Sequence, residues 1–193
     1  TRFRNVTGVQ TCALPISPEL FLVASELKSR PDYAVRLARL KAADAATRGL
    51  GGYERALKKL PCGLLENNAC SVYAVRPGAC RGMTSISRAA CESAYNGQNA
   101  EVQTPSVWTL LRNAHKQALW AALDAANLPS VSYEYHQGLL IALETEDGER
   151  RWLAGEDIFA GCAREGTNAA DAASNKRIIE QLVAGALGKE PPA

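Results

Sequence analysis

Residues 107–126 have the sequence VWTLLRNAHKQALWAALDAA, and this stretch decides the fold class. Its apolar side chains recur every three or four residues and form one broad face, as in an amphipathic helix. Asn127 and Pro129 follow and favour termination of the helix. We therefore expect a long helix that lies in the core. The tryptophans expected to fill that core are Trp108, Trp120 and Trp152.

Helical patterns also precede this stretch. Ser17 is a candidate cap and Pro18 suits a first helical position, so a helix is predicted from there to about Arg30. Asp32 is the predicted cap of a second helix that extends to about Thr47. A short helix over 53–60 is expected next, and Ser87 is the predicted cap of a helix that carries Cys91.

The C-terminal third is also expected to be helical. Residues 135–145 predict a helix, although the Asp147-Gly148 pair leaves a hairpin open as an alternative. A last helix is predicted over 171–187. The expected fold is therefore mostly α: a single helical domain over 18–187 with an irregular cysteine-rich loop region, followed by a disordered tail at 188–193.

Composition limits the classes of function. The chain has 193 residues, is 47% hydrophobic and has a formal net charge of +2. Its basic residues are interspersed with acids, so no nucleic-acid partner is expected. No apolar run approaches the roughly 20 residues of a membrane helix, and the N-terminus lacks the pattern of a signal peptide. A cytoplasmic protein without a membrane partner is the expectation, and no protein partner is predicted.

The segment from Pro61 to about Ser87 is rich in Pro, Gly, Asn and Ser and has little periodicity. Its region carries four cysteines, separated by seven, nine and ten residues: Cys62, Cys70, Cys80 and Cys91. Thiolates suit zinc or an iron–sulfur cluster. The spacing alone leaves three possibilities open, namely a metal site, inert thiols and disulfides. Arg76 and Arg81 are expected to compensate thiolate charge and to lower the pKa of Cys80.

Residues 61–81, PCGLLENNACSVYAVRPGACR, resemble the signature of the YkgJ-type cysteine-cluster family, a zinc- or iron-chelating domain. The segment RWLAGE at 151–156 is also similar to segments of its members. The resemblance implies that the four cysteines are metal ligands, with an iron–sulfur cluster as one form of the cofactor. It also implies that Arg76, Arg81 and Tyr73 surround the ligands. Some relatives are flagellin lysine N-methylases, so an iron–sulfur-dependent enzyme of that kind is one alternative, and a structural helical protein with incidental thiols is another.

Residues 6–17, VTGVQTCALPIS, resemble the in-frame translation of a common sequencing adapter. We therefore expect residues 1–17 to be an artefactual segment and Cys12 to have no inherited role. Family members carry a further cluster of cysteines at the corresponding place. The hypothesis that follows is a truncated site, with weaker metal binding than in a protein that has both clusters.

Other candidate residues receive structural interpretations. A lone histidine on a helix, such as His115, is more often a packing or solvent-facing residue than a ligand. For His136, which is near a predicted helix start, capping or aromatic packing explains the residue as well as catalysis does. Cys162 lies outside the family motif and is expected to be a thiol. No serine or cysteine has an identifiable histidine and acid partner, so the sequence does not predict an enzyme.

Overall fold

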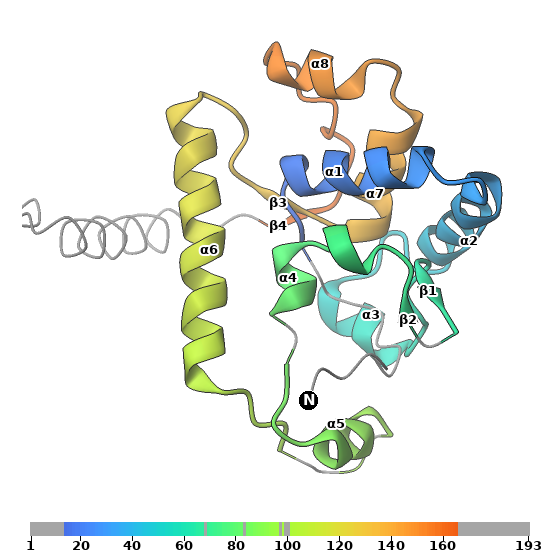
Figure 1. Cartoon of the computed structure of the whole chain (residues 1–193), viewed down its shortest axis with the longest axis vertical. Coiled ribbons are helices and arrows are strands. Elements are labelled where there is room, and N and C mark those ends of the chain that lie inside the picture. The colour runs from blue at the N-terminus through green and yellow to red at the C-terminus, as the bar shows by residue number, and fades with distance from the viewer. Residues whose placement is uncertain (1–13, 68, 83, 97, 99–100, 166–193) are drawn as a thin grey trace, which may run out of the picture.

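The computed structural model describes residues 14–67, 69–82, 84–96, 98 and 101–165, and these are mostly helical (Figure 1). This confirms the expected fold class. The predicted helix over 171–187, the tail at 188–193 and residues 1–13 lie outside the described residues. The helices are α1 (Ser17–Lys28), α2 (Tyr33–Ala45), α3 (Gly52–Leu57), α4 (Gly78–Arg81), α5 (Arg88–Tyr95), α6 (Ser106–Ala125), α7 (Tyr135–Glu144) and α8 (Gly148–Leu153), with a 3-10 helix η1 (Tyr73–Val75). The strands are β1 (Leu65–Glu66), β2 (Ala69–Cys70), β3 (Ser132–Tyr133) and β4 (Arg164–Glu165).

Helix α1 begins one residue earlier than its capping pattern predicts. Ser17 is already helical and buried, and Ile16 holds the N-cap position, so the prediction of a Ser17 cap is wrong. The carboxylate of Glu19 compensates, because its Oε2 accepts the backbone N–H of Ile16 at 3.1 Å near the positive end of the helix dipole. The helix ends before Pro31, as predicted.

The core lies where α1 crosses α7 beside α2 (Figure 1). Leu20 and Val23 of α1 and Leu139 of α7 are fully buried. Phe21 extends the core towards α8, since its ring centroid lies 5.6 Å from those of Trp152 and Phe159. Burial of each such side chain stabilises the fold by about 1.5–3 kcal/mol. These packed faces hold α1, α7 and α8 together.

Helix α2 starts at the predicted place but is not capped as predicted. Asp32 occupies the N-cap position without a side-chain bond to the helix backbone. Its carboxylate instead accepts hydrogen bonds from Arg36 Nη2 at 2.6 Å and Arg30 Nε at 3.2 Å. The buried Arg36 side chain also donates to Glu66 Oε2 at 2.8 Å, and this bond attaches α2 to β1.

Helix α6 stands to one side of the other helices (Figure 1), and the expectation that it is a core helix is only partly correct. Trp120 and Leu123, in its C-terminal half, are buried. Trp108 and Leu110, in its N-terminal half, are 51% and 60% exposed, so Trp108 does not fill the core as predicted. The apolar period of this segment marks a helix, but its first turns have no described partner to cover them.

Two short antiparallel pairs, β1–β2 and β3–β4, complete the described fold. The backbone N–H of Tyr133 in β3 also donates to Pro15 O at 2.8 Å. Leu14–Ser17, the end of the adapter-like segment, therefore packs with the rest of the chain, and Ile16 is only 2% exposed.

The region after β3 is helical, not a hairpin. Asp147, with a φ of 51°, and Gly148 lead into α8 instead of joining two strands. Among the described helices, none is both long enough and apolar enough to cross a membrane.

Candidate metal centre

The irregular segment brings three of the predicted ligands onto the core. Cys62 follows α3, Cys70 ends β2 and Cys80 lies in α4. All three are partly buried thiols that pack against the apolar core. The turn between β1 and β2 positions Cys70 opposite Leu65, which brings its segment back beside the one that carries Cys62.

Burial and the neighbouring thiols both affect the pKa values of Cys62 and Cys80. Burial raises the pKa of Cys62 to about 11, and nearby Cys70 and Glu134 contribute to the increase. Burial raises the pKa of Cys80 to about 12, with further increases from Cys62, Cys70 and Glu19. Each thiolate would therefore form in an environment that already disfavours negative charge. Arg76 does lower the pKa of Cys80, as predicted for a neighbouring cation, but burial, the other two thiols and Glu19 outweigh it, so the net shift is upward.

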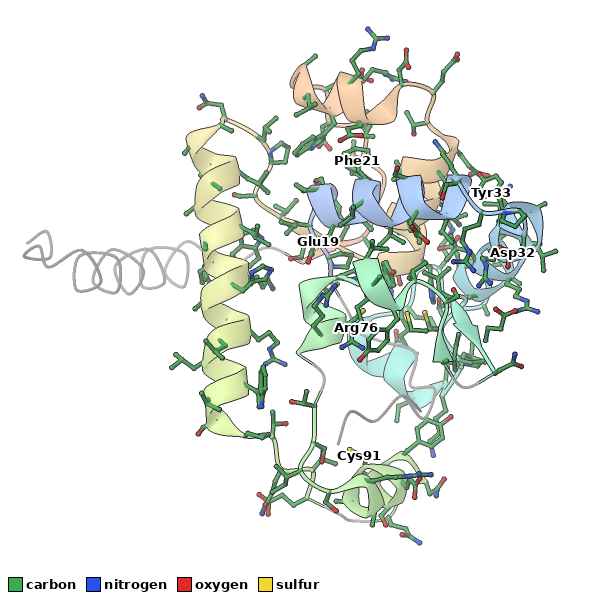
Figure 2. All side chains as sticks on the ribbon, in the orientation of Figure 1. Glu19, Phe21, Asp32, Tyr33, Arg76 and Cys91 are labelled. Carbon is green, nitrogen blue, oxygen red and sulfur yellow. The ribbon has the colours of Figure 1, made fainter. Side chains whose placement is uncertain are left out.

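Cys91 is placed elsewhere. It lies on α5, whose start is capped as predicted: Ser87 Oγ accepts the N–H of Ala90 at 3.2 Å. Figure 2 shows the labelled Cys91 on this helix, well away from Arg76 and Glu19. Unlike the other three cysteines, Cys91 does not pack against the apolar core. The structure therefore separates it from the group formed by Cys62, Cys70 and Cys80, which we call the thiol cluster.

The three residues predicted to surround the ligands have different roles in the structure. The Arg76 guanidinium lies 3.8 Å from the ring centroid of Tyr73 and lowers the pKa of Cys80 slightly against the larger opposing effects. Arg81 bonds the backbone of its own segment: its Nε donates to Arg76 O at 2.9 Å and its Nη2 donates to Ala74 O at 2.5 Å. Arg76 thus supplies positive charge near the cluster, whereas Arg81 holds the backbone of the preceding turn.

Acidic and aromatic residues that the sequence analysis did not single out also lie near the thiol cluster. Glu19 Oε1 accepts the N–H of Gly78 at 2.6 Å and connects α1 to α4. Glu134, 4% exposed, caps α7 by accepting the N–H of Gln137 at 2.7 Å, and its other oxygen lies 3.6 Å from Arg55 Nη1. Burial, with the nearby cysteines and Glu19, raises the pKa of Tyr135 well above its usual range. Their positions around the cysteines depend on the folded chain, so no local motif signals them.

His136 is committed to a structural bond. Its ring is buried, and its Nε2 accepts the backbone N–H of Gly63 at 3.2 Å, next to Cys62 in the chain. Burial lowers the pKa of His136, which favours the neutral ring that this bond requires. The ring also stacks with Tyr135 at a centroid distance of 6.0 Å, so aromatic packing, one of the explanations left open by the sequence, accounts for it. It therefore fixes the loop that carries Cys62.

The donor types of the cluster suit zinc or iron, but its geometry is not that of a closed site. Thiolate sulfur is a common ligand of both metals. In the part of the chain that the structure describes, however, no three His, Cys, Asp or Glu side chains are arranged so that they could hold a metal ion. Fold and site together define a mostly helical protein with three clustered thiols on its core.

No protein-family model matches the chain, and neither a curated protein nor a solved structure matches it. The similarity of residues 61–81 to the cysteine-cluster signature thus stays a prediction from the sequence. Cys162, also a thiol, is separate from that segment and buried, with its Sγ 3.8 Å from Glu134 O.

Proposed function

We propose that this protein binds zinc or iron through Cys62, Cys70 and Cys80. The observation that carries the proposal is the convergence of three partly buried cysteines from three separate segments, where Cys70 raises the pKa of Cys62 and both raise the pKa of Cys80. A metal would supply the cross-link that a segment with few apolar residues of its own lacks.

The environment also favours a cation. Glu19 and Glu134 both raise the pKa of a thiol in the cluster, which means that their negative charge extends to it. A divalent cation that replaces the thiol protons would offset this repulsion. The donors described here do not complete a coordination sphere, so the proposal requires either a shift of these side chains when the metal binds or additional ligands.

A structural role for the cysteines is the second candidate, and a specific observation favours it. The three thiols pack against the apolar core, and burial raises the pKa values of Cys62 and Cys80. Protonated cysteines in such places behave as small apolar side chains. This candidate predicts a protein without a stoichiometric metal ion.

Elemental analysis, combined with a visible spectrum, tests the proposal on protein purified without oxygen. We expect stoichiometric zinc, or iron with the absorbance of an iron–sulfur cluster. The triple variant Cys62→Ser/Cys70→Ser/Cys80→Ser should lose the metal. Cys91→Ser is the matched control, because it removes a thiol from the same region and lies outside the cluster, so it should keep the metal.

Two results would reject the assignment of these ligands. Metal-free wild-type protein would favour the structural role of the thiols. Loss of metal from Cys91→Ser as complete as from the triple variant would mean that Cys91 is a ligand after all. Circular dichroism of each variant is required alongside, so that loss of metal is not confused with loss of helix.

A further inference from the structure

A cleft of about 210 Å³ lies where the start of α1 meets α4 and α6. Helix α6 contributes Arg112, His115, Lys116 and Leu119, and α4 contributes Gly78 and Ala79. Apolar cavities of about 150 Å³ bind benzene, so this cleft has room for a molecule of that size that also carries a polar group. None of the three clustered cysteines lines it, although Glu19 borders both the cleft and the thiol cluster.

Arg112 is the most distinctive residue of the cleft. A Cβ atom built on Gly82 would lie 2.2 Å from Arg112 Cδ, so the glycine leaves the space in which the arginine side chain lies against the end of α4. The side chain is partly buried, and its guanidinium forms no hydrogen bond or ion pair with any residue in the described part of the chain. A guanidinium has five N–H donors in a planar fork that matches a carboxylate.

The charge of the cleft is positive overall. Glu19 is the acid that lines it, and both oxygens of its carboxylate already accept backbone N–H groups, from Ile16 and Gly78. Lys116 adds a second positive charge, with its Nζ 4.4 Å from the ring centroid of Trp120. The cleft would therefore attract an anion. Because the Glu19 carboxylate repels negative charge, a singly charged anion is favoured over a doubly charged one.

Apart from Asn113 and His115, the rest of the lining is apolar. Leu119 and Ala79 face the cleft from α6 and α4, and Leu14 and Ile16 close it from the start of the described chain. Because Leu14 and Ile16 belong to the adapter-like segment, the walls from α4 and α6 carry the argument. We propose that this cleft binds a small amphipathic carboxylate, with the carboxylate on Arg112 and the apolar part against Leu119.

Benzoate is the probe that tests this site. Titration of isotope-labelled protein should give a saturable shift of the Trp120 indole N–H resonance, since this ring lies beside Lys116. Arg112→Gln should weaken benzoate binding by roughly tenfold or more, because a hydrogen-bonded charge pair is lost. Arg150→Gln makes the same change of charge on α8, where the side chain is 78% exposed, and should leave binding unchanged.

The chemistry of the ligand is tested by two further probes. Benzyl alcohol, which is uncharged, and inorganic phosphate, which has no apolar part, should both bind more weakly than benzoate. Equal binding of benzyl alcohol, or tighter binding of phosphate, would overturn the proposal of an amphipathic carboxylate. The absence of any saturable shift with benzoate, or an unchanged affinity in Arg112→Gln, would overturn the site itself.

A second variant keeps the test decisive if Arg112→Gln does not fold. Gly78→Ala places a methyl group in the cleft, 2.9 Å from His115 Cδ2 and 3.2 Å from Glu19 Oε1. The exposed His115 ring can turn aside, so we expect the helical content to be retained. Benzoate should bind this variant several-fold more weakly, and wild-type affinity would count against the site.

Discussion

Helices α1 and α6 both have apolar side chains at helical spacing, but these side chains are buried in α1 and largely exposed in the first half of α6. Leu20, Val23 and Leu27 of α1 are at most 1% exposed, because α7 and α2 cover them. Leu110 and Leu111 of α6 are 60% and 54% exposed. An apolar stripe thus predicts that a segment is helical, whereas its burial depends on whether another element packs against it.

The largest expected effect comes from truncating one leucine in each helix. Leu20→Ala should lower the free energy of unfolding by about 2–5 kcal/mol, since it leaves a cavity between α1 and α7. Leu110→Ala should change it by no more than about 0.5 kcal/mol, because that side chain is already in solvent. Urea denaturation of both variants measures the difference. Equal losses would mean that α6 is covered in solution.

A smaller effect is expected from adding a methyl group at the same helix crossing. A Cβ on Gly138 would lie 2.8 Å from Leu20 Cδ1 and 3.3 Å from Tyr133 Cβ. Overpacking costs about 1–3 kcal/mol and the gain in helix propensity returns up to about 1 kcal/mol, so Gly138→Ala should destabilise the fold by about 1 kcal/mol.

Two comparisons sharpen this prediction. Gly161→Ala is the control, since a Cβ there meets nothing within 4 Å, and it should be nearly neutral. In a Leu20→Ala background the clash is absent, so Gly138→Ala should cost less there than in the wild type. Additive losses in the double variant would show that the two residues do not meet.

The smallest expected effect comes from a charge interaction, at the start of α2. The hydrogen bond from Arg36, with help from Arg30, lowers the pKa of Asp32 to about 2 from an unfolded value near 3.8. Because the folded pKa is the lower one, the stabilisation is complete above about pH 4 and is lost as the pH falls towards 2. Carboxyl NMR should give this pKa directly, and a value near 3.8 would contradict the ion pair.

Acid denaturation provides the matched comparison. Asp32→Asn removes the charge at every pH, so wild type and variant should differ in stability at neutral pH and converge as the pH approaches 2. A difference that persists unchanged at low pH would mean that the substitution acts through packing.

Local sequence signals predicted most of the described helices, but not the short helices α4 and α8. The α1 and α7 segments and the Ser87 cap follow from periodicity and capping chemistry, which involve residues close together in the chain. The cap at Ser17 was wrong because Glu19 and Ile16 form a competing local bond. The predicted burial of α6 was wrong for its first turns, because burial depends on elements far away in the sequence.

The candidate site, too, was predicted only where the signal is local in the sequence. The composition of residues 61–87 predicted an irregular segment, and its three cysteines influence one another in the structure. The spacing of the cysteines in the chain could not show that Cys91 lies apart from the other three. No periodic pattern predicts the direction that the chain takes between α4 and α5. Glu134 and His136 could not be predicted as neighbours of Cys62, because the fold alone brings α7 to that loop.

The short strand β3 has a consequence for the order of folding. The Tyr133 N–H donates to Pro15 O, close to the first residue that the structure describes. The strand also pairs with β4, which contains the last described residues. Such a junction closes long loops, and its entropic cost is repaid only after the intervening helices have formed. We therefore expect the strand junction to form late, after residue 165 has left the ribosome, while α1 and α2 can form earlier.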